Sequence, residues 1–180
     1  MSSPRTKKPA GQVALVGAGA GDPGLLTVRA VELLSTADLV LADARVADAV
    51  LARVSPQAEV VRTDPADAVG PQLVAAAKEG RSVVRLLPGD PFSGEEGAKE
   101  ADAVVKGKQR LEVVPGIPTA TAVTAYAGIA LGTPHTVARY TESLDWRSLS
   151  SAPGPLVPFI GNRCPSRSTG PDGRSLKRPA

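Results

Sequence analysis

The 180-residue sequence contains one cysteine, one histidine and few aromatic residues. With Cys164 alone, no intrachain disulfide forms and no Cys/His zinc cluster is available, so we expect a reducing compartment and no metal site. Aromatic residues make up only 3% of the chain, which argues against stacking of nucleobases on its surface. No apolar run approaches the roughly 20 residues of a membrane span, and the basic start lacks a signal-peptide core. We therefore expect a cytoplasmic protein without a membrane partner.

Positive charge is concentrated at the two ends of the chain. Residues 1–10 carry +3 and residues 161–180 carry +4, which leaves −4 for residues 11–160. The pI of 9.2 thus reflects the ends, and we expect no nucleic-acid partner. Residues 1–10 are predicted to be a flexible basic segment. Residues 161–180 are too poor in apolar side chains to offset chain ordering, which predicts a disordered tail.

Short apolar runs alternate with helix-forming segments along most of the chain. Runs typical of strands buried on both faces occupy residues 13–16, 38–43, 59–61, 82–87 and 111–114. Helices are predicted over residues 22–36, with Asp22 as N-cap, and over 48–53, 72–79, 98–106 and 119–127. Residues 155–160 are predicted to open a strand of a further unit. The alternation predicts an α/β fold with a mainly parallel sheet and flanking helices.

Three glycine- or proline-rich breakers follow the predicted strands, at residues 17–22 (GAGAGD), 88–92 (PGDPF) and 115–116 (PG). Ligand sites in parallel sheets gather at these carboxyl ends. The first loop precedes a helix, which is typical of a dinucleotide-binding site. In such a site, Asp43 would bind the ribose. Against this interpretation, Asp22 places a carboxylate where the pyrophosphate would bind. A tight turn without a ligand is a further alternative.

Five segments, in order, resemble the motifs of the tetrapyrrole methylases, in particular the uroporphyrinogen-III C-methyltransferases. They are residues 17–27 (GAGAGDPGLLT), 37–46 (ADLVLADARV), 83–92 (VVRLLPGDPF), 113–117 (VVPGI) and 125–131 (AYAGIAL). The resemblance implies a tetrapyrrole-methylase-like first lobe over 11–115 and the start of an incomplete second lobe over 116–160. Relatives continue with elements that complete this second lobe, so we expect a truncated methylase.

The resemblance also implies a reaction: methyl transfer from S-adenosyl-L-methionine to electron-rich pyrrole carbons of uroporphyrinogen III, giving precorrin-2 on the route to sirohaem or cobalamin. The methyl donor is a cationic sulfonium without phosphate, which removes the difficulty raised by Asp22. The family also suggests a homodimer. Two alternatives stay open: a catalytically silent methylase fragment or partner-binding remnant, and a nucleotide-dependent oxidoreductase.

Residue roles follow from the same resemblance. Asp43 matches the family's proton acceptor, and a carboxylate suits the cation that methylation of a pyrrole carbon creates; the alternative is an acid paired with Arg45. Asp90 accepts hydrogen bonds from the ligand or fixes its loop. The positions matching cofactor contacts are Ala20, Pro88, Gly89, Asp90, Ser93, Pro118, Thr119 and Ile160. Alternatives for these positions are a plain turn at 88–91 and a helix N-cap at Thr119.

The substrate implied by the resemblance carries many carboxylates, so cations are expected around it. This sequence lacks the lysine that relatives carry after the third strand and the arginine that follows their Gly-Asp-Pro-Phe loop. We predict that Arg62, Arg85 and His135 bind substrate in their place. The alternatives are ordinary surface or strand-end charges for the two arginines and a solvated loop residue for His135.

Overall fold

The computed structural model describes residues 11–64, 67–139 and 144–159. Contacts between residues divide the chain into two units, Met1–Ala127 and Gly128–Ala180. The first unit thus extends beyond residue 115, where the sequence places the end of the first lobe. The predicted flexible start and disordered tail lie outside the described residues, as do Ile160 and Cys164.

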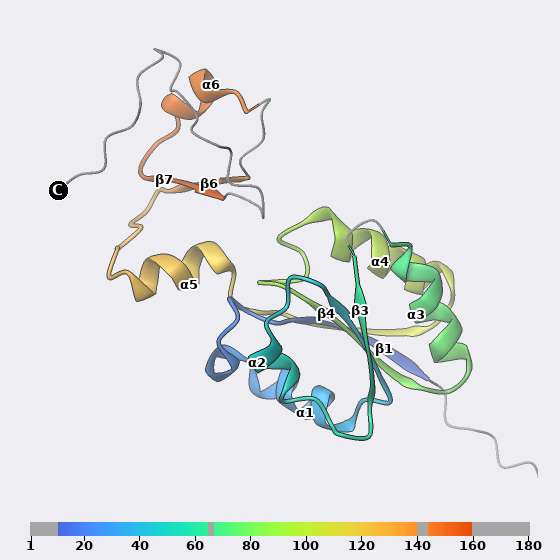
Figure 1. Cartoon of the computed structure of the whole chain (residues 1–180). Coiled ribbons are helices and arrows are strands. Elements are labelled where there is room, and N and C mark those ends of the chain that lie inside the picture. Colours follow the sequence, from blue (N-terminus) through green and yellow to red (C-terminus); the bar gives the residue numbers. More distant parts are fainter. Residues whose placement is uncertain (1–10, 65–66, 140–143, 160–180) are drawn as a thin grey trace, which may run out of the picture. The chain divides into compact units, whose positions relative to one another are not determined.

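The first unit contains a five-stranded sheet with the order β3-β2-β4-β1-β5 (Figure 1). Its strands are β1 (Gln12–Gly17), β2 (Leu39–Asp43), β3 (Glu59–Thr63), β4 (Ser82–Leu87) and β5 (Arg110–Val114). Every neighbouring pair is parallel, and Val13 in β1 is in register with Val83 in β4 and Leu111 in β5. The carboxyl ends of the strands therefore share one edge of the sheet. The predicted α/β class with a parallel sheet is confirmed.

Helices cover both faces of this sheet, with α1 and α2 on one side and α3 and α4 on the other (Figure 1). The helices are α1 (Val28–Thr36), α2 (Asp48–Leu51), α3 (Val69–Lys78), α4 (Glu95–Lys106) and α5 (Thr119–Tyr126). Successive side chains of a strand point to opposite faces. Accordingly, Val16 of β1 packs in one cluster with Leu34 of α1, whereas Leu15 packs in another with Leu73 of α3. The apolar run in β1 thus serves two cores.

The predicted single helix over residues 22–36 is wrong, because the segment forms two helices. A short 3-10 helix, η1 (Pro23–Leu25), is followed by extended backbone at Leu26 and Thr27. Each helix has its own N-cap: Asp22 Oδ1 accepts from Gly24 N at 2.7 Å, and Thr27 Oγ1 accepts from Ala30 N at 3.2 Å. A second capping residue five positions after the first starts a second helix.

The described part of the second unit contains β6 (Thr136–Arg139), α6 (Trp146–Ser150) and β7 (Leu156–Phe159). Strands β6 and β7 form a two-stranded parallel sheet. The predicted strand over 155–160 is confirmed for Leu156–Phe159, whereas β6 and α6 were not predicted. Helix α6 is short and is held by its N-cap, since Asp145 Oδ1 accepts from Arg147 N at 3.0 Å and from Ser148 N at 3.1 Å. Among the described residues, no helix has both the length and the apolar character needed to cross a bilayer.

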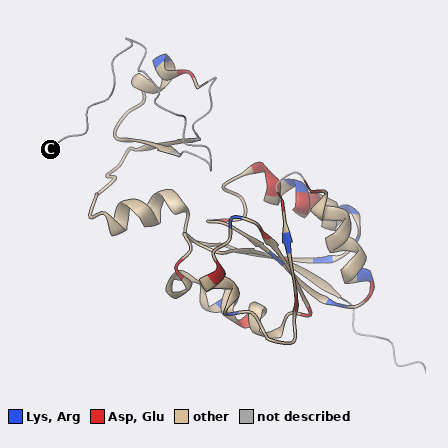
Figure 2. Ribbon diagram, in the orientation of Figure 1, with Lys and Arg blue, Asp and Glu red and all other residues tan. Residues whose placement is uncertain are grey.

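Helix α4 carries charged residues of both signs (Figure 2). Lys99 pairs with Glu95 at 2.8 Å, and Lys106 pairs with Asp102 at 2.6 Å. These pairs are exposed, so each contributes little to stability. The outer surface of this helix is therefore a solvated face of mixed charge.

Candidate functional site

Two loops are joined at the carboxyl edge of the sheet, where β1 and β4 end side by side. Gly19 N donates to Gly89 O at 3.1 Å, and Gly89 N donates to Gly19 O at 2.8 Å. Both glycines have a φ of 65°, which residues with a side chain rarely adopt. Together with Gly17 and Gly116, they form what we call the glycine junction.

The glycine junction brings the loop after β5 against the other two. A Cβ placed on Gly116 would lie 2.2 Å from Gly89 O, and a Cβ on Gly17 would lie 2.5 Å from Gly116 N. Side chains are therefore excluded at both positions. Gly89 differs, because a Cβ there would meet Thr119 Oγ1 at 3.4 Å, an ordinary contact distance. The sequence predicts that these loops share an edge, but not that their backbones touch.

Asp90 joins two of these loops through its carboxylate. Oδ1 accepts from Phe92 N at 2.9 Å within its own loop, and Oδ2 accepts from Gly116 N at 3.1 Å in the loop after β5. Both oxygens thus already hold a backbone N–H. Of the two predicted roles for Asp90, the contacts match that of fixing the loop.

The other predicted cofactor positions lie in the same loops, next to the glycine junction. They are Ala20, Pro88, Ser93, Pro118 and Thr119. Pro118 and Ser93 are exposed, whereas Ala20, Pro88 and Thr119 are half-buried. The ring of Phe92, between Asp90 and Ser93, is 52% exposed. The apolar ring of Phe92 and the hydroxyl of Ser93 therefore lie in the same loop as Gly89, which carries no side chain.

Asp22 is occupied on both oxygens. Oδ1 caps η1 through Gly24 N, and Oδ2 accepts from the Tyr126 hydroxyl of α5 at 2.8 Å. These two hydrogen bonds, the one from Gly24 first, lower the pKa of Asp22. The predicted N-cap role is confirmed. An ionised carboxylate thus stands at the helix start that a dinucleotide phosphate would need.

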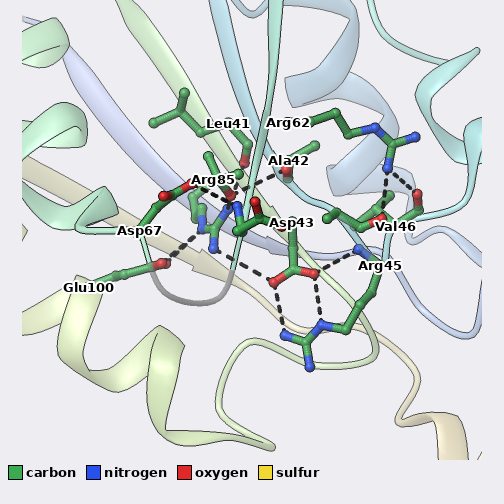
Figure 3. Close-up of polar contacts among 12 residues, drawn as sticks. Leu41, Ala42, Asp43, Arg45, Val46, Arg62, Asp67, Arg85 and Glu100 are labelled. Atoms are coloured by element: carbon green, nitrogen blue, oxygen red, sulfur yellow. Dashed lines mark hydrogen bonds and ion pairs between the residues drawn. The ribbon is translucent and has the colours of Figure 1, made fainter. Parts of the chain in front are cut away.

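Asp43, the predicted proton acceptor, ends β2 and is fully buried. Arg45 grips both its oxygens, with Nε donating to Oδ1 at 2.8 Å and Nη2 donating to Oδ2 at 2.8 Å, while Arg45 N donates to Oδ1 at 2.9 Å (Figure 3). Burial raises the pKa of Asp43, but the hydrogen bonds from Arg45 outweigh it and leave the pKa below its usual value. The structure thus has the ion pair weighed above as the alternative. A lowered pKa makes a weak proton acceptor.

Arg85, predicted to bind substrate, is instead in the interior. Its Nε donates to both carboxylate oxygens of Glu100 at 3.0 and 2.9 Å, and its Nη1 donates to Thr63 Oγ1 at 2.7 Å. Its Nη2 lies 4.0 Å from Asp43 Oδ2. Burial raises the pKa of Glu100, against the effect of the guanidinium beside it. We call Asp43, Arg45, Arg85 and Glu100 the charge cluster (Figure 3).

The two other predicted substrate-binding residues have local partners. Arg62 donates from Nη1 to Ala44 O at 3.2 Å and forms an ion pair with Asp48, so it holds the loop between β2 and α2. His135 belongs to the second unit, where its Nδ1 lies 3.0 Å from Gly132 O. The ring is exposed. Neither contact involves the glycine junction or the charge cluster.

Sequence reasoning missed Glu100, Tyr126 and Thr63 as parts of these arrangements. One signal existed for Glu100: an arginine in a strand buried on both faces requires a buried acid. Thr63 follows from register, because it is paired with Asp43. Tyr126 lies within one of the five resembling segments, but nothing local connects it to Asp22, which precedes it by over a hundred residues.

Comparison with known proteins agrees with this arrangement. Residues 12–163 match the model of the family described as "Tetrapyrrole (Corrin/Porphyrin) Methylases". The chain therefore belongs to the tetrapyrrole methylases, a family of methyltransferases that use S-adenosylmethionine.

Particular relatives narrow the comparison. The chain is 37% identical over 176 residues to the siroheme synthase of Photobacterium profundum, covering 87% of this chain and 37% of that protein. It is 46% identical over 129 residues to the siroheme synthase of Pseudomonas fluorescens strain Pf0-1, covering 67% of this chain and 28% of that protein. It thus spans well under half the length of these curated relatives.

Solved structures give the same result. The uroporphyrin-III C-methyltransferase of Thermus thermophilus superposes with a TM-score of 0.67 at 38% identity, covering 72% of this chain and 60% of that one. A second structure of the Thermus thermophilus enzyme, complexed with S-adenosyl homocysteine, has a TM-score of 0.62 at 34% identity, covering 71% of this chain and 55% of that one. A cobalt precorrin-4 methyltransferase matches at 28% identity with a TM-score of 0.67, covering 73% of this chain and 59% of that one.

Proposed function

We propose that this chain binds S-adenosylmethionine at the glycine junction and that two successive methyl transfers, each from a new cofactor molecule, to two pyrrole carbons of uroporphyrinogen III give precorrin-2. The observation that carries the proposal is the convergence of three glycine loops at the carboxyl ends of β1, β4 and β5. Family membership adds the reaction class, and the Thermus enzyme solved with S-adenosyl homocysteine adds the ligand class.

The residues at the junction suit such a cofactor. Gly89 is without a side chain, and Thr119 Oγ1 would be 3.4 Å from a Cβ there, so a hydroxyl lies beside the backbone of Gly89. Hydroxyl and backbone groups suit the ribose and the amino-acid part of the cofactor. The exposed ring of Phe92 offers an apolar wall for an adenine.

Charge favours this cofactor over a dinucleotide. The ionised Asp22 occupies Gly24 N at the start of η1, so a pyrophosphate would meet an anion instead of free N–H groups. A sulfonium is a cation and is not repelled by this carboxylate. The negative charge of Asp22 therefore disfavours a nucleotide-dependent oxidoreductase as the function.

When bound, S-adenosylmethionine supplies an electrophilic methyl group, and the remaining work is done by the chain. Asp90 fixes the loops after β4 and β5 relative to each other, which holds Gly89 and Thr119 in place. Asp43 provides negative charge near the carboxyl ends of the strands, where a methylated pyrrole would become cationic. Proton removal by Asp43 requires that Arg45 release it.

A second candidate function is partner binding without catalysis. The pairing of Asp43 with Arg45 favours it, because a carboxylate held at a lowered pKa is a poor proton acceptor. It predicts cofactor affinity without methyl transfer.

Calorimetric titration of S-adenosyl homocysteine into the full chain tests the cofactor claim. We expect saturable binding that Gly89→Ala weakens and that Gly132→Ala leaves unchanged, since both glycines have a φ of 65° but only Gly89 lies at the junction. Absence of binding would remove the proposal. Formation of precorrin-2 from uroporphyrinogen III is assayed separately, and binding without product would favour the partner-binding candidate.

A further inference from the structure

The ion pair between Asp43 and Arg45 crosses from the interior to the surface. The Asp43 side chain is fully buried, whereas the Arg45 side chain is 27% exposed. Asp43 accepts hydrogen bonds from Nε and Nη2 of the guanidinium and none from Nη1. One partner is therefore fixed inside, and the other reaches the carboxyl edge of the sheet.

Asp43 keeps other partners if the Arg45 side chain turns away. The backbone N–H of Arg45 still donates to Oδ1. Arg85 Nη2 stands 4.0 Å from Oδ2 and is itself anchored by Glu100 and Thr63. Departure of the Arg45 side chain thus leaves the buried aspartate with a second guanidinium nearby, which limits the cost of the exchange.

The loop that carries Arg45 borders the glycine junction. A Cβ on Gly21, in the loop after β1, would lie 3.5 Å from Ala47 Cβ. On the other side, the Glu96 carboxylate at the start of α4 is close enough to help raise the pKa of Arg45, behind the larger effect of Asp43. The loop that carries Arg45 therefore lies against the loop after β1, and its guanidinium is within electrostatic reach of the start of α4.

We propose that Arg45 is a specificity-determining residue that exchanges Asp43 for a carboxylate of the substrate, and that this exchange releases Asp43. The inference rests on the proposed function, whose substrate is a polycarboxylate. A planar guanidinium recognises any carboxylate in the same two-pronged geometry, so the incoming carboxylate can replace Asp43 bond for bond. Recognition of the correct substrate and release of the carboxylate then become one event.

The charges around Asp43 explain what release changes. The groups that face it are Arg45 from its own loop, Arg85 from β4 and, through Arg85, Glu100 from α4; Glu96 acts on Arg45. With Arg45 turned outward, Asp43 and Glu100 share one arginine and the buried group becomes net negative. The pKa of Asp43 then rises, which improves it as a proton acceptor.

Binding of uroporphyrin III, measured by its fluorescence, tests the exchange with three variants. Arg45→Leu is expected to weaken binding about tenfold, the loss of one charge-assisted contact. Asp43→Asn is expected to tighten it several-fold, because the competing carboxylate is gone. The matched control is Arg81→Leu, since Arg81 pairs with Glu59 at 2.7 Å and its side chain is 28% exposed, but it precedes β4 at the opposite edge of the sheet. Binding of uroporphyrin III by Arg81→Leu should be unchanged.

Asp43→Asn carries the test if Arg45→Leu fails to fold, and Arg45→Lys, which keeps the charge without the fork, gives an intermediate loss. Carboxyl carbon NMR of Asp43 supplies a reading that a merely structural pair would not move: its pKa should rise when uroporphyrin III binds. Unchanged or weaker binding in Asp43→Asn, or a fixed Asp43 titration, overturns the inference. Loss of S-adenosyl homocysteine binding in the wild type would instead overturn the proposed function, so the two failures are distinguishable.

Discussion

The glycine junction and the charge cluster lie at the same edge of one sheet and are held together in opposite ways. At the junction, backbone meets backbone, and a Cβ on Gly116 would come within 2.2 Å of Gly89 O. In the charge cluster, four charged side chains form ion pairs, three of them in the interior and the fourth, Arg45, partly exposed. The first is fixed by the absence of side chains and has one arrangement. The second is fixed by ion pairs, whose partners can be exchanged.

This difference suits the two tasks of a group-transfer site, which are holding the cofactor and recognising the substrate. A cofactor that must be held in one pose is served by rigid backbone, where no rotamer can change. A substrate that must be recognised before reaction is served by a guanidinium that has a choice of carboxylates. Each of the following substitutions disrupts either the glycine junction or the charge cluster and leaves the other intact.

The largest effect is expected from Arg85→Met, which leaves Glu100 buried without its cation. Removing one member of a buried pair costs about 4 kcal/mol of unfolding free energy. Urea unfolding measures this loss. Adding Glu100→Leu to the variant should recover most of it, because no unpaired charge then remains; a double variant as unstable as the single one would show that packing, not charge, dominates at this position.

Gly116→Ala is expected to cost somewhat less, about 3 kcal/mol, because the new methyl group forces the backbones at the junction apart. Gly19→Ala is the matched control within the same junction. Its φ is 65° but the nearest atom to a Cβ is 3.9 Å away, so it should lose only the strain of a left-handed conformation, about 1 kcal/mol. Equal losses in the two variants would contradict close backbone contact.

The strands and their order of appearance were predictable, whereas the partners of buried polar groups were not. An apolar run such as Val13–Val16 identifies a buried strand from local pattern alone. The pairing of Asp43 with Arg45 was foreseen as an alternative, because the two residues are two positions apart. The position of Arg85 depends on Glu100, which comes from a helix later in the chain, so the local pattern did not show that Arg85 lies in the interior.

The edge of the sheet at which the three loops lie was predictable, and the cofactor site at that edge stays a prediction. The breakers at Gly17, Gly89 and Gly116 mark the correct edge, since parallel strands end together. The three loops touch because β1 lies between β4 and β5 in the sheet. This strand order cannot be read from any local sequence pattern. Predicting that residues 22–36 form two helices would have required recognising Thr27 as the N-cap of the second helix.

Asp90→Ala should cost about 1.5 kcal/mol through the loss of two hydrogen bonds from backbone N–H groups to a carboxylate. It should also weaken binding of S-adenosyl homocysteine, because the loops after β4 and β5 are no longer held to each other. Asp102→Ala is the control, since Asp102 makes an exposed pair with Lys106 and lies on α4. Thermal unfolding and calorimetry give the two readings, and intact affinity in Asp90→Ala would separate Asp90 from the cofactor site.

The smallest effect concerns pH. Because the pKa of Asp43 is lower in the folded protein than its usual 3.8, its contribution to stability is present above 3.8 and is lost as the pH falls through the folded value. Glu100 acts in the opposite sense, since its raised pKa loses stability as the pH rises from 4.5. Comparing urea unfolding of the wild type and Asp43→Asn at about pH 3 and about pH 5 isolates the Asp43 part. The difference between the two proteins should be larger at the higher pH.

The most direct measurement is amide NMR of the full chain titrated with S-adenosyl homocysteine. The account predicts that the backbone signals of Gly19, Gly89, Gly116 and Thr119 move together with a single affinity, while Gly24 N, capped by Asp22, stays in place. Signals that move only at Gly24 and its neighbours, or that respond to a nicotinamide dinucleotide in place of the homocysteine derivative, would contradict it.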